Sequence, residues 1–397
     1  MQLAQFTRHL KPSETLAISA KAKALRAQGR EVIDFSVGEP DFNTPDNVIQ
    51  AAEHAMAEGF TKYTQASGLP GLRQAIADKL QRENDLHYEP EQIIVSCGAK
   101  HVLYNLARVL VDPGDEVIIP GPYWVTYPTQ VEMAGGTPVI IPTTAADDFK
   151  ITGEVLRRYL TPATKGIILN SPCNPTGAVY TPEELQDLAD VLGDTGLYVI
   201  TDEIYEHMVY DGLRQISIAT LSAELKERCI VVNGVSKSYS MTGWRVGYCA
   251  GPSDVIAACG HLQSQSTSNP AAFAQVAAIE ALTGPQDSVH AMAAAFVERR
   301  DFVVRRLNAI DGISCPTPQG AFYTFPKINA LFGRRANGRS LSNSAEVIDY
   351  LLDTAGVAVV PGEAFGADDH MRLSYAASME ALHTGLDRLD QAVQQLR

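Results

Sequence analysis

The strongest constraint on the fold is a series of seven short apolar segments, each suited to a buried strand. They lie at residues 93–95, 116–119, 138–141, 166–169, 198–200, 230–232 and 246–249. Helix-like patterns separate them, and the clearest begins at Thr181, where a hydroxyl cap, Pro182 and Glu184 coincide. Strands that are apolar on both faces and alternate with helices predict a mostly parallel, seven-stranded α/β sheet.

The chain changes character near Thr283, after which two or three strand candidates precede a closing helix over residues 380–396. Another helix is predicted over residues 14–28, with a stop at Gly29. We expect a large domain of residues 43–290 and a smaller α+β domain built from residues 1–42 and 291–397. The charged run that contains Arg299, Arg300 and Arg305 is expected to be a solvated helix face.

Composition disfavours several classes of protein. The 397 residues carry a formal net charge of −14, which argues against a general nucleic-acid or acidic-membrane surface. The six cysteines form no CxxC pair and most lie in apolar segments, so reduced thiols are expected and neither a zinc site nor another metal site is predicted. With no signal-peptide core and no apolar run of about 18 residues, we expect a cytoplasmic protein.

Ligands of open α/β sheets bind at the carboxyl ends of the strands, so the residues after each apolar segment are candidates for a binding site. After the first segment, Gly98 and Ala99 lead into a helix whose N-terminus favours a phosphate, although a plain strand-to-helix turn is equally consistent. Trp124 follows the next segment and is either a packed aromatic side chain or a platform for a planar ligand.

Four further positions carry polar side chains that have two interpretations each. Asn174 lies in a double-proline turn and either punctuates it or donates to a ligand. Asp202 ends a buried strand, which suits an ion pair or a cationic ring nitrogen. Lys237, with Arg245 eight positions later, is a solvated loop residue or a desolvated amine that attacks carbonyl groups. Arg372, on an apolar strand, is expected to meet a carboxylate of the protein or of a substrate.

Several of these stretches, in this order, resemble the class I/II aminotransferases of pyridoxal-phosphate fold type I. The matching stretches are Gly38-Glu-Pro-Asp, Ser171-Pro-Cys-Asn-Pro-Thr-Gly, Thr201-Asp-Glu-Ile-Tyr, Ser236-Lys237 with Met-Thr-Gly-Trp-Arg245, and Arg372-Leu-Ser-Tyr. The resemblance runs from about Lys11 to the C-terminus, and it favours the functional interpretation at each position above.

The resemblance implies a site for pyridoxal 5'-phosphate. Lys237 would hold the cofactor as a Schiff base and would shuttle a proton between substrate and cofactor. Asp202 would pair with the pyridinium nitrogen, and Trp124 would stack on the ring. Tyr205 and Asn174 would bind the phenolic oxygen of the cofactor.

The same resemblance implies which residues hold the cofactor phosphate. They are Gly98, Ala99, Ser236, Arg245 and, reaching across from a second subunit, Tyr63. A homodimer is therefore implied. The sequence departs from the family at Gly234, because many relatives carry a serine three residues before the lysine.

The substrate residues are implied in the same way. Arg372, Asn174, Trp124 and the backbone of Gly38 would bind the α-carboxylate. The chain is most similar to a bacterial aspartate aminotransferase branch without the usual distal arginine, and three residues match positions used there: Lys100 and Thr15 for a distal carboxylate, and Lys11 for prephenate. The implied reaction converts L-aspartate and 2-oxoglutarate to oxaloacetate and L-glutamate, with prephenate as a further acceptor.

Three alternatives are weighed against this interpretation. An aminotransferase for aromatic or neutral amino acids would share the cofactor residues and differ in the distal pocket. A pyridoxal-phosphate lyase or decarboxylase would use the same lysine but would need no keto-acid acceptor. The sensing half of a transcription regulator would follow a DNA-binding domain, and the acidic chain, which reaches its first substrate-loop residue at Lys11, disfavours that reading.

Overall fold

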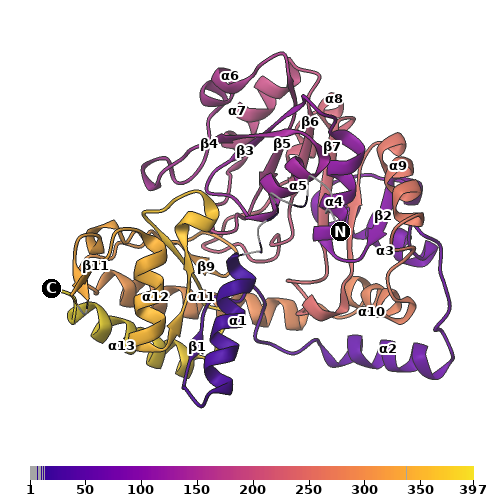
Figure 1. Cartoon of the computed structure of the whole chain (residues 1–397). Coiled ribbons are helices and arrows are strands. Elements are labelled where there is room, and N and C mark those ends of the chain that lie inside the picture. The colour runs from indigo at the N-terminus through magenta and orange to yellow at the C-terminus, as the bar shows by residue number, and fades with distance from the viewer. Residues whose placement is uncertain (1–6, 8–9, 11, 13, 337) are drawn as a thin grey trace, which may run out of the picture.

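A seven-stranded sheet forms the centre of the larger part of the molecule (Figure 1). The computed structural model describes residues 7, 10, 12, 14–336 and 338–397. The strands are β2 (Ile93–Ser96), β3 (Glu116–Pro120), β4 (Thr137–Ile141), β5 (Thr164–Asn170), β6 (Tyr198–Asp202), β7 (Cys229–Gly234) and β8 (Gly247–Ala250). Their order is β2-β8-β7-β6-β5-β3-β4, and only β8 runs antiparallel to its neighbours. The prediction of a mostly parallel, seven-stranded sheet is confirmed.

Helices cover both faces of this sheet because alternate strand residues point to opposite sides. On one face, Ile94 and Val117 pack against α4 (Ala99–Leu110), α5 (Thr126–Ala134) and α9 (Ser253–Ser264). On the other face, Val95 and Ile118 belong to a core shared with α3 (Pro70–Asn84), α6 (Gly153–Tyr159), α7 (Pro182–Gly193), α8 (Ala223–Lys226) and α10 (Ala272–Thr283). The predicted capping box is present, since the Thr181 hydroxyl accepts from the Glu184 N–H at 3.3 Å.

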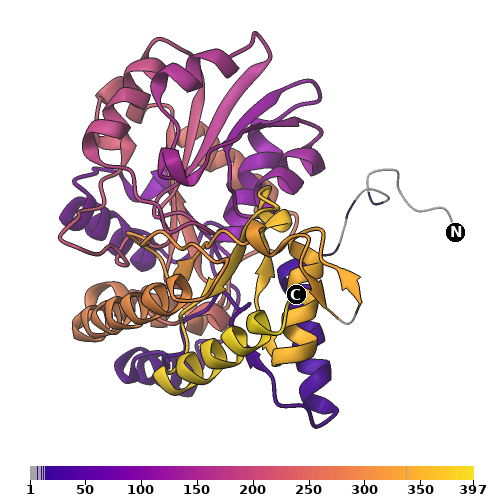
Figure 2. The same cartoon turned by 90° about the vertical axis from the view of Figure 1, so that its left-hand side faces the viewer.

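A smaller α+β domain packs beside the larger part (Figure 2). Its sheet has the order β13-β14-β9 and is antiparallel. Its elements are α1 (Glu14–Ala27), β1 (Ile33–Asp34), α11 (Asp287–Asn308), β9 (Tyr323–Thr324), β10 (Arg335–Ala336), β11 (Arg339–Ser340), α12 (Ser344–Ala355), β12 (Val357–Ala358), β13 (Val360–Pro361), β14 (Met371–Ser374) and α13 (Met379–Gln394).

Segments that lie far apart in the sequence meet in this domain. The short strand β1 pairs in parallel with β12, and α1 contacts β12 and β13. The helix α2 (Asp46–Ala57) lies on the other side of the molecule, where it packs against α10 (Figure 1). The predicted domain limits, residues 43–290 against 1–42 and 291–397, remain a prediction. Within the described ranges, no helix is both long and apolar enough to cross a membrane.

The expectation that the charged run of α11 is solvated is wrong for Arg299 and Arg300. Arg299 is 9% exposed and pairs with Asp41 at 2.6 Å. Arg300 is 3% exposed and donates to both carboxylate oxygens of Asp211, at 2.6 and 2.8 Å. The burial could not be foreseen from the sequence pattern, because Asp41 and Asp211 lie far away along the chain. Glu298, Asp301 and Arg305 of the run are exposed, as expected.

We predict that Arg300→Met destabilises the protein by about 2 kcal/mol, because charge-assisted hydrogen bonds from a buried guanidinium are lost. The matched control is Arg305→Met on the same helix, which should change the free energy of unfolding by less than about 0.5 kcal/mol. Urea unfolding of both variants measures the difference. Equal stability of the two variants would show that the Arg300 ion pair contributes nothing.

Candidate active site

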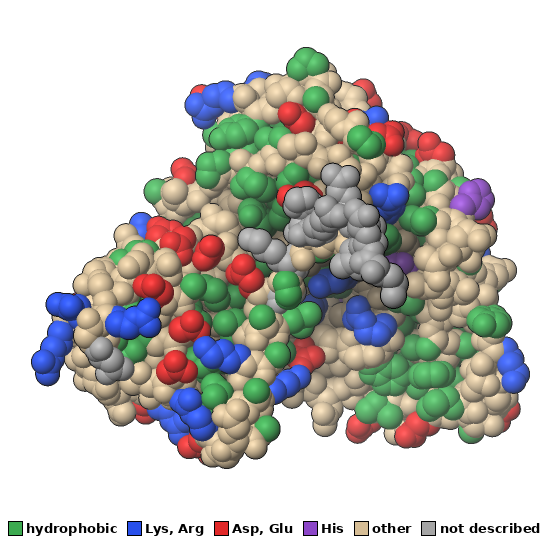
Figure 3. Space-filling view, in the orientation of Figure 1, with side chains coloured by type: hydrophobic (Ala, Val, Ile, Leu, Met, Phe, Trp, Pro, Cys, Tyr) green, Lys and Arg blue, Asp and Glu red, His purple; other side chains and the backbone are tan. Residues whose placement is uncertain are grey.

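One cavity of about 560 Å³ lies where the predicted site residues converge. Twelve of those residues line it: Thr15, Gly38, Ala99, Lys100, Trp124, Asn174, Asp202, Tyr205, Ser236, Lys237, Arg245 and Arg372. Gly98 lies beside the cavity, in contact range of the Arg245 guanidinium. Lys11 lies outside the described residues. Lys and Arg side chains are visible in the hollow between the two parts of the molecule (Figure 3).

Lys237 follows the end of β7 and is half-buried. Its Nζ donates a hydrogen bond to the Gly38 carbonyl oxygen at 2.5 Å. Burial lowers the pKa of this amine to about 8, and Arg372 and Arg245 act in the same direction, while Glu39 and Asp202 oppose them. The amine can therefore both lose and regain a proton near neutral pH, which suits nucleophilic attack and proton transfer.

Asp202 is the last residue of β6, and its carboxylate is buried. The Tyr127 hydroxyl donates to Oδ2 at 2.7 Å and the Ile204 N–H donates to Oδ1 at 3.3 Å. Burial raises the pKa of Asp202 to about 6, although these two bonds and Lys237 partly offset the effect. Both hydrogen bonds come from neutral donors, so a cationic group in the cavity would stabilise the carboxylate strongly.

Tyr127 is a site residue that the sequence analysis did not single out. It is buried, lines the cavity and packs edge-on against Trp124, with ring centroids 5.4 Å apart. A signal was available, because Tyr127 lies three residues after Trp124, at the start of the helix that follows the strand end. The contact with Asp202 itself could not be foreseen, since 75 residues separate the two.

The N-terminus of α4 forms an anion cradle with Arg245. Gly98, the N-cap residue, has φ of +86°, and a Cβ there would overlap the Arg245 guanidinium. Arg245 donates to the carbonyl oxygens of Thr242, at 2.8 Å, and Cys97, at 3.2 Å, which fixes the guanidinium beside the helix end. Unpaired N–H groups, the helix dipole and a guanidinium together favour a phosphate.

The departure at Gly234 has a structural reason. A Cβ at this position would lie 3.0 Å from the Cα of Gly247 in β8 and 3.1 Å from the Val246 carbonyl oxygen. The close approach of β7 and β8 therefore leaves little room for a serine. Ser236 is buried and lines the cavity, so it supplies the nearest hydroxyl before Lys237.

Arg372, on β14, is a fully buried cation. Its Nη1 donates to Asn174 Oδ1 at 2.9 Å and its Nη2 donates to the Ser36 carbonyl oxygen at 2.7 Å. The guanidinium lies 4.5 Å from the ring centroid of Tyr323 and 4.9 Å from that of Phe365. Its buried Nε has no hydrogen-bond partner in the part of the chain that the structure describes. Burial lowers its pKa, so an added carboxylate would relieve a desolvated charge.

Tyr323 is a second residue that the sequence analysis missed. Its hydroxyl lies 2.9 Å from that of Tyr205, and both side chains are buried. Burial raises the pKa of each phenol, so both remain protonated and can donate hydrogen bonds. No local pattern marks Tyr323, because it reaches the cavity through the pairing of β9 with β14.

The residues expected at a distal carboxylate lie at the cavity mouth. Lys100, in the first turn of α4, is exposed, and its Nζ lies 4.9 Å from the Trp124 ring centroid. Partial removal of the amine from water lowers the pKa of Lys100, and the positive charge of Arg245 lowers it further. Thr15 lines the cavity from the first turn of α1 and is half-buried. Tyr63 is 91% exposed and is not among the residues that line this cavity.

Comparison with known proteins gives consistent matches over the whole chain. The profile described as aminotransferase class I and II matches residues 30–389. The chain is 50% identical to the aspartate aminotransferase of Bacillus sp. (strain YM-2), covering 98% of this chain and 99% of that protein. It is 47% identical to the aspartate/prephenate aminotransferase of Cereibacter sphaeroides, covering 96% of each. The crystal structure of the aspartate aminotransferase from Rhizobium meliloti superimposes with a TM-score of 0.96, 45% identity and complete coverage of both chains.

We predict that Asp202→Asn stabilises the ligand-free protein at pH 7 and above. The pKa of Asp202 is about 6 in the folded protein but has the ordinary value of 3.8 in the unfolded chain, so between these values the folded protein binds more protons than the unfolded chain. The free energy of unfolding of the wild type therefore falls as pH rises from about 4 to 6. At roughly 1.4 kcal/mol per pKa unit, the free energy of unfolding of the variant at pH 7 should exceed that of the wild type by about 3 kcal/mol. The variant should also lose this pH dependence.

Unfolding at pH 4 and pH 7.5 measures this prediction. Asp211→Asn is the matched control, because Arg300 holds the pKa of Asp211 below its usual value and the substitution should destabilise the protein instead. A variant Asp202→Asn that is less stable than the wild type at pH 7.5 would contradict the prediction.

Proposed function

The chain belongs to the class I and II aminotransferases, and from that premise we propose that it is an aspartate aminotransferase. The proposed reaction converts L-aspartate and 2-oxoglutarate to oxaloacetate and L-glutamate. The observation that carries the proposal is the convergence of Lys237, Asp202 and Arg372 on one cavity, in a chain about half identical to aspartate aminotransferases over its full length.

The family uses pyridoxal phosphate, and the cavity offers a matching group for each part of that cofactor. The α4 N-terminus with Arg245 suits the phosphate, and the buried carboxylate of Asp202 suits a protonated ring nitrogen. The half-buried amine of Lys237 suits an aldehyde carbon. The residues proposed to hold the cofactor are Gly98, Ala99, Trp124, Asn174, Asp202, Tyr205, Ser236, Lys237 and Arg245, with Tyr63 of a second copy.

When bound, pyridoxal phosphate supplies an electron sink that stabilises negative charge on the substrate α-carbon. Lys237 takes the proton from that carbon and later returns one, a role that a pKa of about 8 permits near neutral pH. Asp202, buried and anionic, keeps the facing nitrogen protonated. Arg372 binds the α-carboxylate through its unpaired Nε and thereby orients the α-hydrogen toward the lysine.

Lys100 and Thr15 are proposed to bind the distal carboxylate of aspartate. Lys100 provides a cation above Trp124 at the open side of the cavity, while Thr15 provides a hydroxyl from α1. This arrangement favours a dicarboxylate over the alternative of a neutral or aromatic amino acid. We propose prephenate as a further amino acceptor, because relatives at 47% identity are named aspartate/prephenate aminotransferases. Lys11 is proposed to contact prephenate.

A homodimer in the cytoplasm is proposed as the working form. Hydrophobic side chains gather over the region of α2 on the face shown in Figure 3. Three large apolar side chains in α2 or just after it are exposed: Met56 at 44%, Phe60 at 39% and Tyr63 at 91%. A second copy packed on this surface would bury them and would bring Tyr63 to the neighbouring site.

We predict that Lys237→Ala lowers the rate of oxaloacetate formation from aspartate and 2-oxoglutarate by more than about 1,000-fold, because the nucleophile and the proton carrier are lost together. Lys165→Ala, at an exposed position, is the control and should retain full activity. Wild-type protein that forms no oxaloacetate, or a Lys237→Ala variant that is fully active, would refute the proposed function.

We predict that Lys100→Ala lowers kcat/KM for aspartate by about 10- to 100-fold, since hydrogen bonds to charged groups contribute roughly 1.5–3 kcal/mol. The kcat/KM for alanine as substrate should change by less than about threefold, because alanine has no distal carboxylate. Lys100→Arg should recover part of the aspartate activity. Equal changes in kcat/KM for the two substrates, or no change for either, would show that Lys100 does not bind the distal carboxylate.

A further inference from the structure

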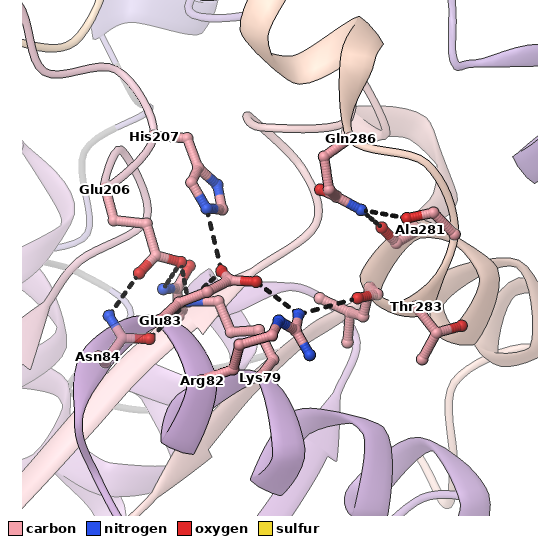
Figure 4. A network of polar contacts seen from close by, with 12 residues as sticks. Lys79, Arg82, Glu83, Asn84, Glu206, His207, Ala281, Thr283 and Gln286 are labelled. Carbon is pink, nitrogen blue, oxygen red and sulfur yellow. Dashed lines mark hydrogen bonds and ion pairs between the residues drawn. The ribbon is translucent and has the colours of Figure 1, made fainter.

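A buried network of charged and amide side chains joins three chain segments of the large domain (Figure 4). Lys79, on α3, is 1% exposed and forms an ion pair with Glu206, whose side chain is 6% exposed. Lys79 also donates to Asn84 Oδ1 at 2.8 Å, and Asn84 Nδ2 donates to Glu206 Oε2 at 2.7 Å. Both carboxylate oxygens of Glu206 therefore have partners.

Asn233, on β7, completes the network. Its Nδ2 donates to Glu206 Oε1 at 2.6 Å, and its Oδ1 accepts from the N–H of Gly234 at 2.7 Å. Its side chain is 1% exposed. One amide group thus connects the carboxylate of Glu206 to the backbone at the point where β7 ends.

The two residues that this hydrogen bond joins are next to the proposed cofactor residues. Glu206 directly follows Tyr205, and Asn233 precedes Ser236 by three positions. Neither Glu206 nor Asn233 lines the active-site cavity, and neither does Lys79. The bond between them therefore ties the segment of Asp202 and Tyr205 to the segment of Ser236 and Lys237 without contact with a ligand.

The outer side of the network is closed by a further layer of charges. Glu83 Oε2 lies 3.2 Å from His207 Nε2 and 3.6 Å from Lys79 Nζ, and Arg82 donates to Glu83 at 2.5 Å (Figure 4). Burial alone would raise the pKa of Glu83, but His207, Lys79 and Arg82 outweigh it and hold the value at about 2. Glu83 and His207 line a second cavity of about 410 Å³, to which Asn84 and Glu206 also contribute.

Stability alone is a poor explanation for the network. Removing Lys79 and Glu206 from water costs several kcal/mol per ion, and an apolar pair of the same volume is often equally stable. Burial by itself would raise the pKa of Glu206, yet Lys79, His207 and Asn84 lower it below the usual value, so the carboxylate remains charged. A charged group with all partners in place fixes geometry more sharply than apolar packing does.

We propose that Lys79, Glu206 and Asn233 are positioning residues that set the separation between the Asp202–Tyr205 segment and the Ser236–Lys237 segment. The inference rests on the proposed function, because those segments carry the residues assigned to the cofactor. Lys79 and Asn84 hold the carboxylate of Glu206 in place, and Asn233 transmits that position to the end of β7. Loss of the Asn233 bond lets the lysine loop move relative to Asp202.

The test compares Asn233→Ala with Lys150→Met in the holoenzyme. Lys150 is the matched control, because it is a buried lysine in another ion pair, with Glu184 at 2.6 Å, that joins no cofactor segment. For Asn233→Ala we expect kcat to fall about tenfold with KM for aspartate within about twofold of the wild type. The pH midpoint of the visible absorption of the bound cofactor should shift by about 0.5 units or more. Lys150→Met should lower the melting temperature only.

A second variant separates hydrogen bonding from charge. Lys79→Met combined with Glu206→Gln removes both charges and the bonds of Lys79 but keeps an amide oxygen that Asn233 can reach, so kcat and the pH midpoint should lie closer to the wild-type values than those of Asn233→Ala. If Asn233→Ala does not fold, Asn233→Ser, whose side chain is too short to reach Glu206, carries the same expectation.

Two results would overturn the proposal. One is an unchanged kcat and pH midpoint in Asn233→Ala or Asn233→Ser. The other is a double variant that loses as much activity as Asn233→Ala. Failure of the proposed function is recognised separately: wild-type holoenzyme would then not convert aspartate, while the pH midpoint of the variants would still report the network.

Discussion

The site depends on the parallel register of three neighbouring strands. Asn170 of β5 pairs with Asp202 of β6, and Asp202 pairs with Val232 of β7, so the three strands end at the same edge of the sheet. Each strand continues into a loop that carries polar groups, and these loops meet at the cavity. A shift of one residue in register would turn Asp202 toward the opposite face of the sheet. The apolar side chains of both cores oppose such a shift.

The cavity concentrates positive charge in a protein of net charge −14. Among the described residues four cations line it, Lys100, Lys237, Arg245 and Arg372, against the carboxylates of Asp202 and Glu39. Three of the cations, Lys100, Lys237 and Arg372, have lowered pKa values chiefly because burial disfavours their charge. Anionic ligands would relieve that cost, which is the physical reason why an acidic chain can bind phosphate and carboxylate groups.

Local signals in the sequence were enough for the sheet and for most of the site. Asp202 and Lys237 each follow a buried strand, and their positions were predictable because ligands of such sheets bind at strand ends. What could not be predicted depends on residues far apart in the chain. Tyr127 reaches Asp202 across 75 positions, Tyr205 reaches Tyr323 across 118, and Arg300 reaches Asp211 across 89. The roles assigned to the site residues, and the second subunit that would supply Tyr63, remain predictions.

The visible absorption spectrum of the purified protein tests the central claim most directly, when it is recorded before and after addition of L-aspartate and then of 2-oxoglutarate. If Lys237, Asp202 and Arg372 hold the cofactor and a dicarboxylate as proposed, a visible band should disappear with aspartate and return with the keto acid. A protein that takes up pyridoxal phosphate but whose spectrum is indifferent to both compounds would contradict the account.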